Sequence, residues 1–264
     1  MFDCGVNLCS KQFNNYLDTL KTHSIGTGLN GWIAISNSEK EWEKNIFYCR
    51  KYSEKNFIIK TTIGIHPHNA VNANFNTWKN LNKLVANNKV IAIGECGLDY
   101  NRMFSPAEIQ MEVFIAQMEI ANKYNLPLYL HERDAHDDFY NLLCIYKAKY
   151  PNLTGIVHCF TGTEEQMKKY IEFGFYIGIT GWICDDRRNK NLCDAVISLP
   201  LDKLILETDS PFLIPFEYSK EWNTNTNQPD SIHYIIKKIS QLTGIEQSKI
   251  KENSIKNTKT LFKI

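Results

Sequence analysis

The chain lacks any long apolar run, and this absence excludes one class of protein. No stretch of its 264 residues approaches the roughly 20 apolar residues that a membrane-spanning helix requires. The first five residues lack the basic and apolar regions of a signal peptide, so we expect no leader. We therefore expect a cytoplasmic protein, with the nucleus as the alternative, and no membrane partner.

The chain also lacks an excess of charge of either sign. It has 30 lysines and arginines against 29 aspartates and glutamates, which gives a formal net charge of +1. Because binding to DNA by charge alone depends on many cationic contacts, this balance excludes a broadly basic protein that coats DNA. A nucleic acid substrate would have to be held by a local patch or by metal ions.

The eight cysteines lack the C-x-x-C spacing of many zinc and redox sites. Spread over 264 residues, they also lack the density of a small disulfide scaffold, and several lie in apolar runs. We expect reduced, buried thiols in a reducing compartment. A hydrophobic content of 43% predicts a packed core rather than a disordered chain.

Short apolar runs of the kind that form buried strands are spaced fairly evenly along the chain. Segments with helical periodicity lie between them, for example at residues 106–124, 134–149 and 163–173. This alternation predicts parallel strands joined by crossover helices. The strand-like runs lie near residues 2–8, 31–36, 57–65, 90–95, 127–131, 154–160, 174–180 and 203–208.

Eight such units predict an α/β fold of the TIM-type (β/α)8 barrel class, with residues 1–264 forming a single domain. The alternative is a doubly wound sheet, which normally has a glycine-rich phosphate turn after its first strand. Residues 5–8 read GVNL and do not match that turn. In a barrel, moreover, catalytic residues gather at the C-terminal ends of the strands.

Four side chains with metal-ligand chemistry come at the ends of four of these apolar runs: Glu95, His131, His158 and Asp209. A buried carboxylate or imidazole at such a place is costly unless it is paired or bound to a metal. Four of them indicate one site built from several strand ends, although each alone could be a separately satisfied polar group. The set suits Mg²⁺, Mn²⁺ or Zn²⁺ in a catalytic site, with one or two ions.

Further candidates would lie on the same rim of the barrel. His66 and His68 follow the third strand and could contact a scissile phosphate or transfer protons, or one of them could stabilise its loop. Arg133 and the Arg187–Arg188 pair could bind phosphates, but the pair could equally be solvated or ion-paired with neighbouring aspartates.

Together, these motifs closely resemble the TatD family of metal-dependent deoxyribonucleases, which belongs to the amidohydrolase-like barrels. The resemblance covers nearly the whole chain, up to KTLF at residues 259–262. The motifs occur in the order FDCGVNL (2–8), GIHPH (64–68), GECGLDY (94–100), LHERDAH (130–136), VHCFTG (157–162) and ETDSP (207–211).

The resemblance implies a TIM-type barrel that binds one or two divalent metals and hydrolyses DNA phosphodiesters, often as a 3′→5′ exonuclease. It implies that Glu95 bridges two ions and that His131 and His158 complete one site. Asp209 would bind the other ion and orient the attacking water, and His66 would lie beside the substrate phosphate. With the candidates above, this gives Asp209, Glu95 and His66 as catalytic residues, and His66, His68, Arg133 and Arg187 as substrate-binding residues.

The chain departs from the pattern of many family members at its first strand. Where many have Asp-x-His-x-His, this chain has Gly5 and Asn7, as in one branch of the family. Glycine offers no ligand and a neutral amide is a weak one, so we expect the ion at Asp209 to be held weakly and to be Mg²⁺. Residues 225–229, NTNQP, also differ from the family's usual Arg-Asn-Glu-Pro.

The leading hypothesis is a Mg²⁺-dependent deoxyribonuclease, acting as a 3′→5′ exonuclease on single-stranded or frayed ends, with RNA as a second substrate class. An alternative is a metal-dependent amidohydrolase acting on a small amide or ester, because the same ligands activate water toward carbonyls. A third is a catalytically silent barrel that binds DNA or a protein partner. We expect a monomer.

Overall fold

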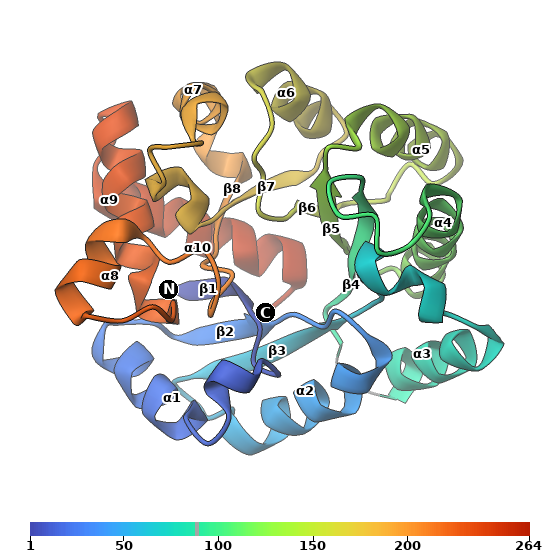
Figure 1. The fold of residues 1–264 in the computed structure, drawn as a ribbon, viewed down its shortest axis with the longest axis horizontal. Coiled ribbons are helices and arrows are strands. Elements are labelled where there is room, and N and C mark those ends of the chain that lie inside the picture. The colour runs from blue at the N-terminus through green and yellow to red at the C-terminus, as the bar shows by residue number, and fades with distance from the viewer. Residues whose placement is uncertain (88–89) are drawn as a thin grey trace.

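The computed structural model describes residues 1–87 and 90–264, in which eight parallel strands follow one another in a single sheet from β1 to β8. Figure 1 shows the strands curling into a barrel with the helices around them. The strands are β1 (Phe2–Val6), β2 (Gly31–Ala34), β3 (Ile58–Ile63), β4 (Ala92–Asp99), β5 (Leu128–Arg133), β6 (Gly155–Val157), β7 (Tyr176–Ile179) and β8 (Leu204–Leu206).

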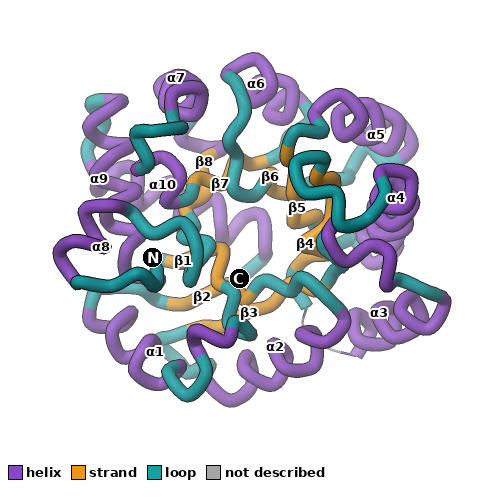
Figure 2. Tube along the Cα trace, viewed as in Figure 1, coloured by secondary structure: helices purple, strands orange, loops and turns teal. Residues whose placement is uncertain are grey.

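Helices connect the strands and form the outer layer, as the tube in Figure 2 makes plain. The α-helices are α1 (Leu17–Gly26), α2 (Glu39–Tyr52), α3 (Phe75–Asn87), α4 (Ala107–Tyr124), α5 (His136–Lys149), α6 (Glu164–Glu172), α7 (Lys190–Ser198), α8 (Phe216–Trp222), α9 (Ile232–Thr243) and α10 (Gln247–Phe262). Short 3₁₀ helices are η1 (Lys11–Phe13), η2 (Pro67–Asn72), η3 (Gly181–Cys184), η4 (Leu201–Lys203) and η5 (Pro229–Ser231).

The seam between the first and last strands is joined mainly by side chains. Asp3 accepts a hydrogen bond from the backbone N–H of Thr208 at 2.9 Å and another from the Thr208 hydroxyl at 2.5 Å. Val6, the last residue of β1, and Ser210, which follows β8, form an isolated parallel bridge. These contacts bring β1 and β8 side by side, which places the polar residues that follow both strands on one rim.

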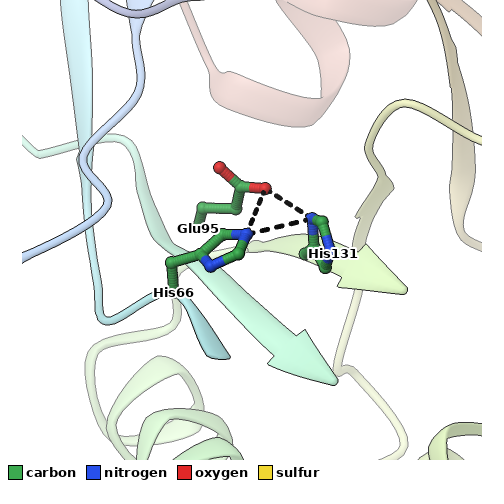
Figure 3. Close-up of side chains that lie close together, drawn as sticks. All are labelled: His66, Glu95 and His131. Carbon is green, nitrogen blue, oxygen red and sulfur yellow. Dashed lines mark hydrogen bonds and ion pairs between the residues drawn. The ribbon is translucent and has the colours of Figure 1, made fainter. Parts of the chain in front are cut away.

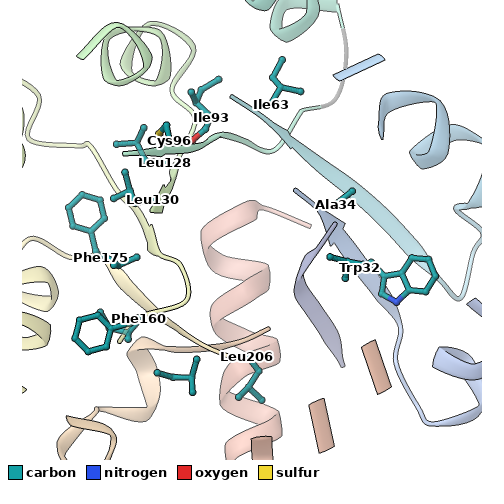
Figure 4. Packing of buried hydrophobic residues seen from close by; sticks show 14 of the residues in the cluster. Trp32, Ala34, Ile63, Ile93, Cys96, Leu128, Leu130, Phe160, Phe175 and Leu206 are labelled. Atoms are coloured by element: carbon teal, nitrogen blue, oxygen red, sulfur yellow. Dashed lines mark hydrogen bonds between the residues drawn. The ribbon is translucent and has the colours of Figure 1, made fainter. Parts of the chain in front are cut away.

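Two layers of apolar side chains fill the molecule. The layer between strands and helices contains residues such as Trp32, Leu130 and Phe175 (Figure 4). A second cluster gathers side chains from several strands with Leu261 and Phe262 of α10. The end of α10 therefore closes one end of the barrel, and the polar rim lies at the other end.

The expected barrel is confirmed, with a strand in each of the eight expected runs. The expected end of the fourth strand is wrong, because β4 continues past Glu95 to Asp99 and pairs with β5 along that length. The cysteines are free thiols in the described structure, as expected, but only Cys4 and Cys96 are buried and the other six are half-buried. No helix of the described residues is long and apolar enough to cross a membrane.

Candidate active site

A cavity of about 430 Å³ opens at the C-terminal rim of the barrel. Residues from all eight strands or the segments that follow them line it, so the fold brings together side chains that are far apart in the sequence. They are Asn7, Asn37, His66, His68, Asn69, Glu95, Asp99, Arg102, His131, Glu132, Arg133, His158, Cys159, Thr161, Trp182, Asp209, Phe212 and Leu213.

The backbone of β4 allows Glu95 to lie deep in this cavity. Gly94 and Gly97 flank it with φ angles of +146° and +142°, a region that side chains rarely adopt. A Cβ on Gly97 would also lie 1.9 Å from the carbonyl oxygen of His131. The two glycines therefore permit β4 and β5 to approach closely, with a shift in register between Gly94 and Cys96.

Glu95 is the centre of a first group of potential metal ligands, which Figure 3 shows with His66 and His131 pointing toward its carboxylate. Glu95 Oε1 lies 2.8 Å from His131 Nδ1 and 3.5 Å from His66 Nε2. The two imidazole nitrogens are 3.3 Å apart. Three ligand atoms of these types, converging this closely, suit a divalent ion.

A second group of potential ligands lies beside the first and consists of His158, Cys159 and Asp209. One ligand atom from each lies within 4.8 Å of the other two. His158 Nε2 connects the groups, because it lies 3.8 Å from both Glu95 Oε1 and Asp209 Oδ1. The four ligands expected from the sequence thus share one pocket, together with His66 and His68.

Asp99 is a buried carboxylate of the site that the sequence reading missed. Its Oδ2 lies 2.8 Å from His68 Nε2 and 3.1 Å from His131 Nε2, so it fixes the orientation of both rings. A carboxylate behind a ligating histidine is the usual arrangement in metal sites. The two-residue period of a strand could have found it, because Glu95 and Asp99 lie four positions apart on one face.

Glu207 fixes the orientation of the His158 ring, and sequence analysis also missed it. Its Oε2 lies 2.8 Å from His158 Nδ1 and accepts a hydrogen bond from the Tyr129 hydroxyl at 2.6 Å. Since a carboxylate only accepts, Glu207 fixes a proton on His158 Nδ1, and Nε2 is the nitrogen that a metal ion could bind after displacing its proton. The Tyr129 hydroxyl and Glu207 also occupy the space beside Gly5, where a Cβ would lie 2.8 Å from the hydroxyl oxygen.

Asn7, which the sequence reading considered only as a weak ligand, orients Asp209. Its amide nitrogen donates to Asp209 Oδ1 at 2.8 Å, and its own oxygen accepts from Asn37 Nδ2 at 3.0 Å. This chain of amides fixes one carboxylate oxygen of Asp209 from the β1 side.

Burial and neighbouring charges set distinct protonation states for the side chains in the cavity. Burial lowers the pKa of His66 to about 3, which keeps this ring neutral. For His131 and His158, burial acts in the same direction but neighbouring carboxylates outweigh it, so their pKa values rise to about 9 and about 10. Burial raises the pKa of Asp209 to about 7, although the nearby His158 opposes this shift.

Glu95 is held as a carboxylate. Burial alone would raise its pKa, but the neighbouring His66 and His158 rings and the hydrogen bond from His131 hold it well below its usual range. The site therefore combines a firmly ionised carboxylate with one whose pKa is near neutrality, an arrangement typical of acid–base chemistry.

The arginines divide between the cavity and the outer surface. Arg133 lines the cavity and lies 5.7 Å from the Trp182 ring. Arg187 is not among the cavity-lining residues; its exposed side chain pairs with Asp185 at 2.7 Å. Arg188 pairs with the same aspartate and lies 3.7 Å from the centre of the Trp182 ring. The ion-paired alternative for the Arg187–Arg188 pair is thus the one observed.

Known proteins match this chain along its whole length. The family model described as TatD related DNase matches residues 2–263. The protein named 3′-5′ ssDNA/RNA exonuclease TatD from Escherichia coli K12 is 38% identical over 264 residues, covering 100% of this chain and 99% of the relative.

Solved structures of related proteins have the same fold. A TatD homolog from Escherichia coli K12 has a TM-score of 0.91 at 23% identity and covers 100% of this chain and 98% of its own. A hydrolase TatD family protein from Entamoeba histolytica has a TM-score of 0.88 at 27% identity and covers 99% and 97%. With the expected motifs in one cavity and relatives matching from end to end, the chain belongs to the TatD-related DNase family.

Proposed function

We propose that this protein is a Mg²⁺-dependent 3′→5′ exonuclease that removes nucleotides from single-stranded ends of DNA or RNA. The observation that carries the proposal is the convergence of three imidazoles on the Glu95 carboxylate, within 3.8 Å, beside Asp209 in one open cavity. The substrate class and direction follow the printed name of the 38% identical relative.

The donor set fits a divalent ion. Glu95, His131, His158 and Asp209 would hold it, and their outer partners Asp99 and Glu207 orient the two histidines as in known metal sites. An ion bound there would polarise the scissile phosphodiester and lower the pKa of a bound water. The two carboxylates, Glu95 and Asp209, favour Mg²⁺ or Mn²⁺, which accept water in the remaining positions.

The protein's own groups would position the reactants. Asp209 would orient the attacking water, with one of its oxygens fixed by the hydrogen bond from Asn7. His66 stays neutral, so it would donate a hydrogen bond to a phosphate oxygen rather than a positive charge. Positive charge at the rim would come from Arg102 and Arg133, which line the cavity.

Apolar side chains at the mouth favour an unpaired nucleic acid end. Trp182 and Phe212 line the cavity, and Phe212 is 51% exposed. Exposed aromatic rings beside arginines are typical of sites on which unpaired bases stack, and stacking needs no particular sequence. A paired base has its faces covered within the duplex, so this surface would select single strands.

The proposal is tested with oligonucleotides whose 5′ end is labelled, so that loss of nucleotides from the 3′ end gives a ladder. We expect Mg²⁺-dependent shortening of single strands that EDTA abolishes. Glu95→Gln should reduce the rate at least ~100-fold. Glu95 would contact the ion directly, and removing even an outer partner of a metal ligand lowers activity by up to about 100-fold. Glu119→Gln is the matched control, since Glu119 pairs with Lys149 in an ion pair outside the cavity.

Two results would contradict the proposal. One is full activity in the Glu95→Gln protein, and the other is turnover of small amides or esters with no loss of nucleotides from any oligonucleotide. The second result would favour the amidohydrolase alternative.

A further inference from the structure

We propose that Cys159 is a metal ligand, and that His158, Cys159 and Asp209 form a position that can also hold zinc-class ions through a thiolate. This inference rests on the proposed metal-dependent function and adds a ligand to it. His158 and Asp209 are expected ligands, whereas the thiol has no part in the mechanism described above. The three ligand atoms lie within 4.8 Å of one another, and all three residues line the cavity.

The backbone explains why two consecutive residues both face the cavity. In a strand, neighbouring side chains point to opposite faces, so His158 and Cys159 would normally diverge. Strand β6 ends at Val157, and Cys159 has a φ of +46°, in the left-handed region that favours glycine. Because of this turn, the side chains of His158 and Cys159 do not alternate between two faces, and both face the cavity.

A buried side chain holds this unfavourable conformation in place. The backbone N–H of Cys159 donates to Glu207 Oε1 at 2.6 Å, and the same carboxylate binds the His158 ring through its other oxygen. Non-glycine residues in such conformations persist only where the surrounding structure enforces them, and they cluster at functional sites.

Few other side chains can complete the position near Asp209. Gly5 has no side chain, and the space beside it is filled by Tyr129 and Glu207. The amide nitrogen of Asn7 points at Asp209 and donates to it, so it cannot ligate in this arrangement. Besides Glu95, the Cys159 sulfur is a cavity-lining donor close to both His158 and Asp209.

The surroundings of the sulfur suit a bound thiolate. The Thr180 hydroxyl lies 3.3 Å from Cys159 Sγ and can donate to it, as outer partners of metal-bound sulfur do. On binding, the ion would displace the thiol proton to solvent and form a metal–sulfur bond without any change of oxidation state. Sulfur, imidazole and carboxylate together are zinc ligands, whereas Mg²⁺ binds oxygen and avoids sulfur.

Cadmium is a direct probe of this bond, because a cadmium–thiolate pair absorbs in the ultraviolet by charge transfer. The purified full-length protein is titrated with Cd²⁺, and binding is followed by absorbance and by calorimetry. We expect the band to saturate at one ion per chain. In Cys159→Ser the band should disappear and Cd²⁺ affinity should fall at least ~10-fold. Removing even an outer partner of a metal ligand lowers metal affinity by about 10-fold or more.

Two controls separate this ligand from the rest of the protein. Cys184→Ser changes another half-buried thiol that lines a different cavity, so its band should match the original protein. Mg²⁺ affinity should change less than twofold in Cys159→Ser, because magnesium does not use the sulfur.

The outcomes distinguish this inference from the proposed function. Cd²⁺ binding without the band, or a band that survives in Cys159→Ser, would overturn the thiolate ligand and leave a magnesium exonuclease intact. Failure of every divalent ion to bind, with no Mg²⁺-dependent nuclease activity, would overturn both.

Discussion

At the scale of single residues, Glu207 has as many partners in the site as the expected ligand Glu95 does. One oxygen binds the rings of His158 and Tyr129, and the other accepts the N–H of Cys159. Its carboxylate therefore fixes the proton on His158 Nδ1 and directs Nε2 toward Glu95 and Asp209. A residue that need not touch the metal or the substrate can thus control which nitrogen of His158 is available to bind a metal ion.

The substitution Glu207→Gln tests this positioning role. An amide nitrogen opposite His158 Nδ1 would favour the wrong tautomer, so we expect Mn²⁺ affinity to fall about 10- to 100-fold. Calorimetry measures the affinity, and circular dichroism checks that the fold remains. Tyr129→Phe, which keeps the carboxylate, should have a smaller effect. Equal metal affinity in Glu207→Gln and the original protein would contradict the role.

At the scale of elements, the close approach of β4 to β5 brings Glu95 next to His131. The approach requires Gly97, where φ is +142° and a Cβ would lie 1.9 Å from the His131 carbonyl oxygen. Backbone rather than a flexible side chain lies in the way, so the two strands would have to separate.

We therefore expect Gly97→Ala to lower the free energy of unfolding by more than about 3 kcal/mol, because a strained φ alone costs about 1–3 kcal/mol. Urea denaturation measures the change. Gly26→Ala is the matched control: this glycine lies in α1 with no atom within 4 Å of an added Cβ. It should stabilise the protein by about 0.4–1 kcal/mol. A similar free energy for both variants would show that β4 tolerates a side chain.

The segment after β7 carries Trp182 to the mouth of the cavity, and its ring is the proposed stacking surface. Stacking of one base contributes about 1–3 kcal/mol, so Trp182→Ala should weaken binding of a single-stranded oligonucleotide roughly 5- to 150-fold. Fluorescence anisotropy with Ca²⁺ in place of Mg²⁺ measures the affinity. Trp222→Ala, which removes a 53% exposed ring at the end of α8, should leave it unchanged. If both variants bind equally well, Trp182 does not contact the bases.

The elements were more predictable from the sequence than their ends. Apolar runs and helical periodicity gave all eight strands, since these depend on local patterns. The end of β4 was missed because a pair of glycines lets the strand continue past a charged residue. The roles of Tyr129 and Glu207 depend on contacts across 78 residues, which no local pattern encodes.

At the scale of the whole molecule, family membership confirms the predicted resemblance and the expected nuclease class. The four expected ligands share a cavity, although their roles remain predictions. Arg187 pairs with Asp185, two residues away, and its role in binding substrate stays a prediction.

The stability of the barrel should depend on pH through Asp3 at the seam. Burial raises the pKa of Asp3 to about 8, although hydrogen bonds from Thr208 and Gly5 oppose this shift. In the unfolded chain its pKa is about 3.9. Between these values the folded state binds the extra proton, so the contribution of Asp3 to the free energy of unfolding decreases as pH rises.

Asp3→Asn cannot ionise and should lose this dependence. We expect the free energy of unfolding of the variant, relative to the original protein, to increase steadily between pH 5 and pH 8, roughly the interval between the two pKa values. Urea denaturation across this range measures it. If the free energies of unfolding of the two proteins change in parallel with pH, Asp3 is not the source of the pH dependence.

The order of the strands has a consequence for the life of the protein in the cell. Asp209 and Glu207 follow β8, the last strand of the sheet, and Asp3 at the start of the chain must find Thr208 to join the seam. A ribosome therefore releases the first seven strands before the proposed nuclease site can be complete. The nascent chain itself therefore cannot hydrolyse the messenger RNA that encodes it.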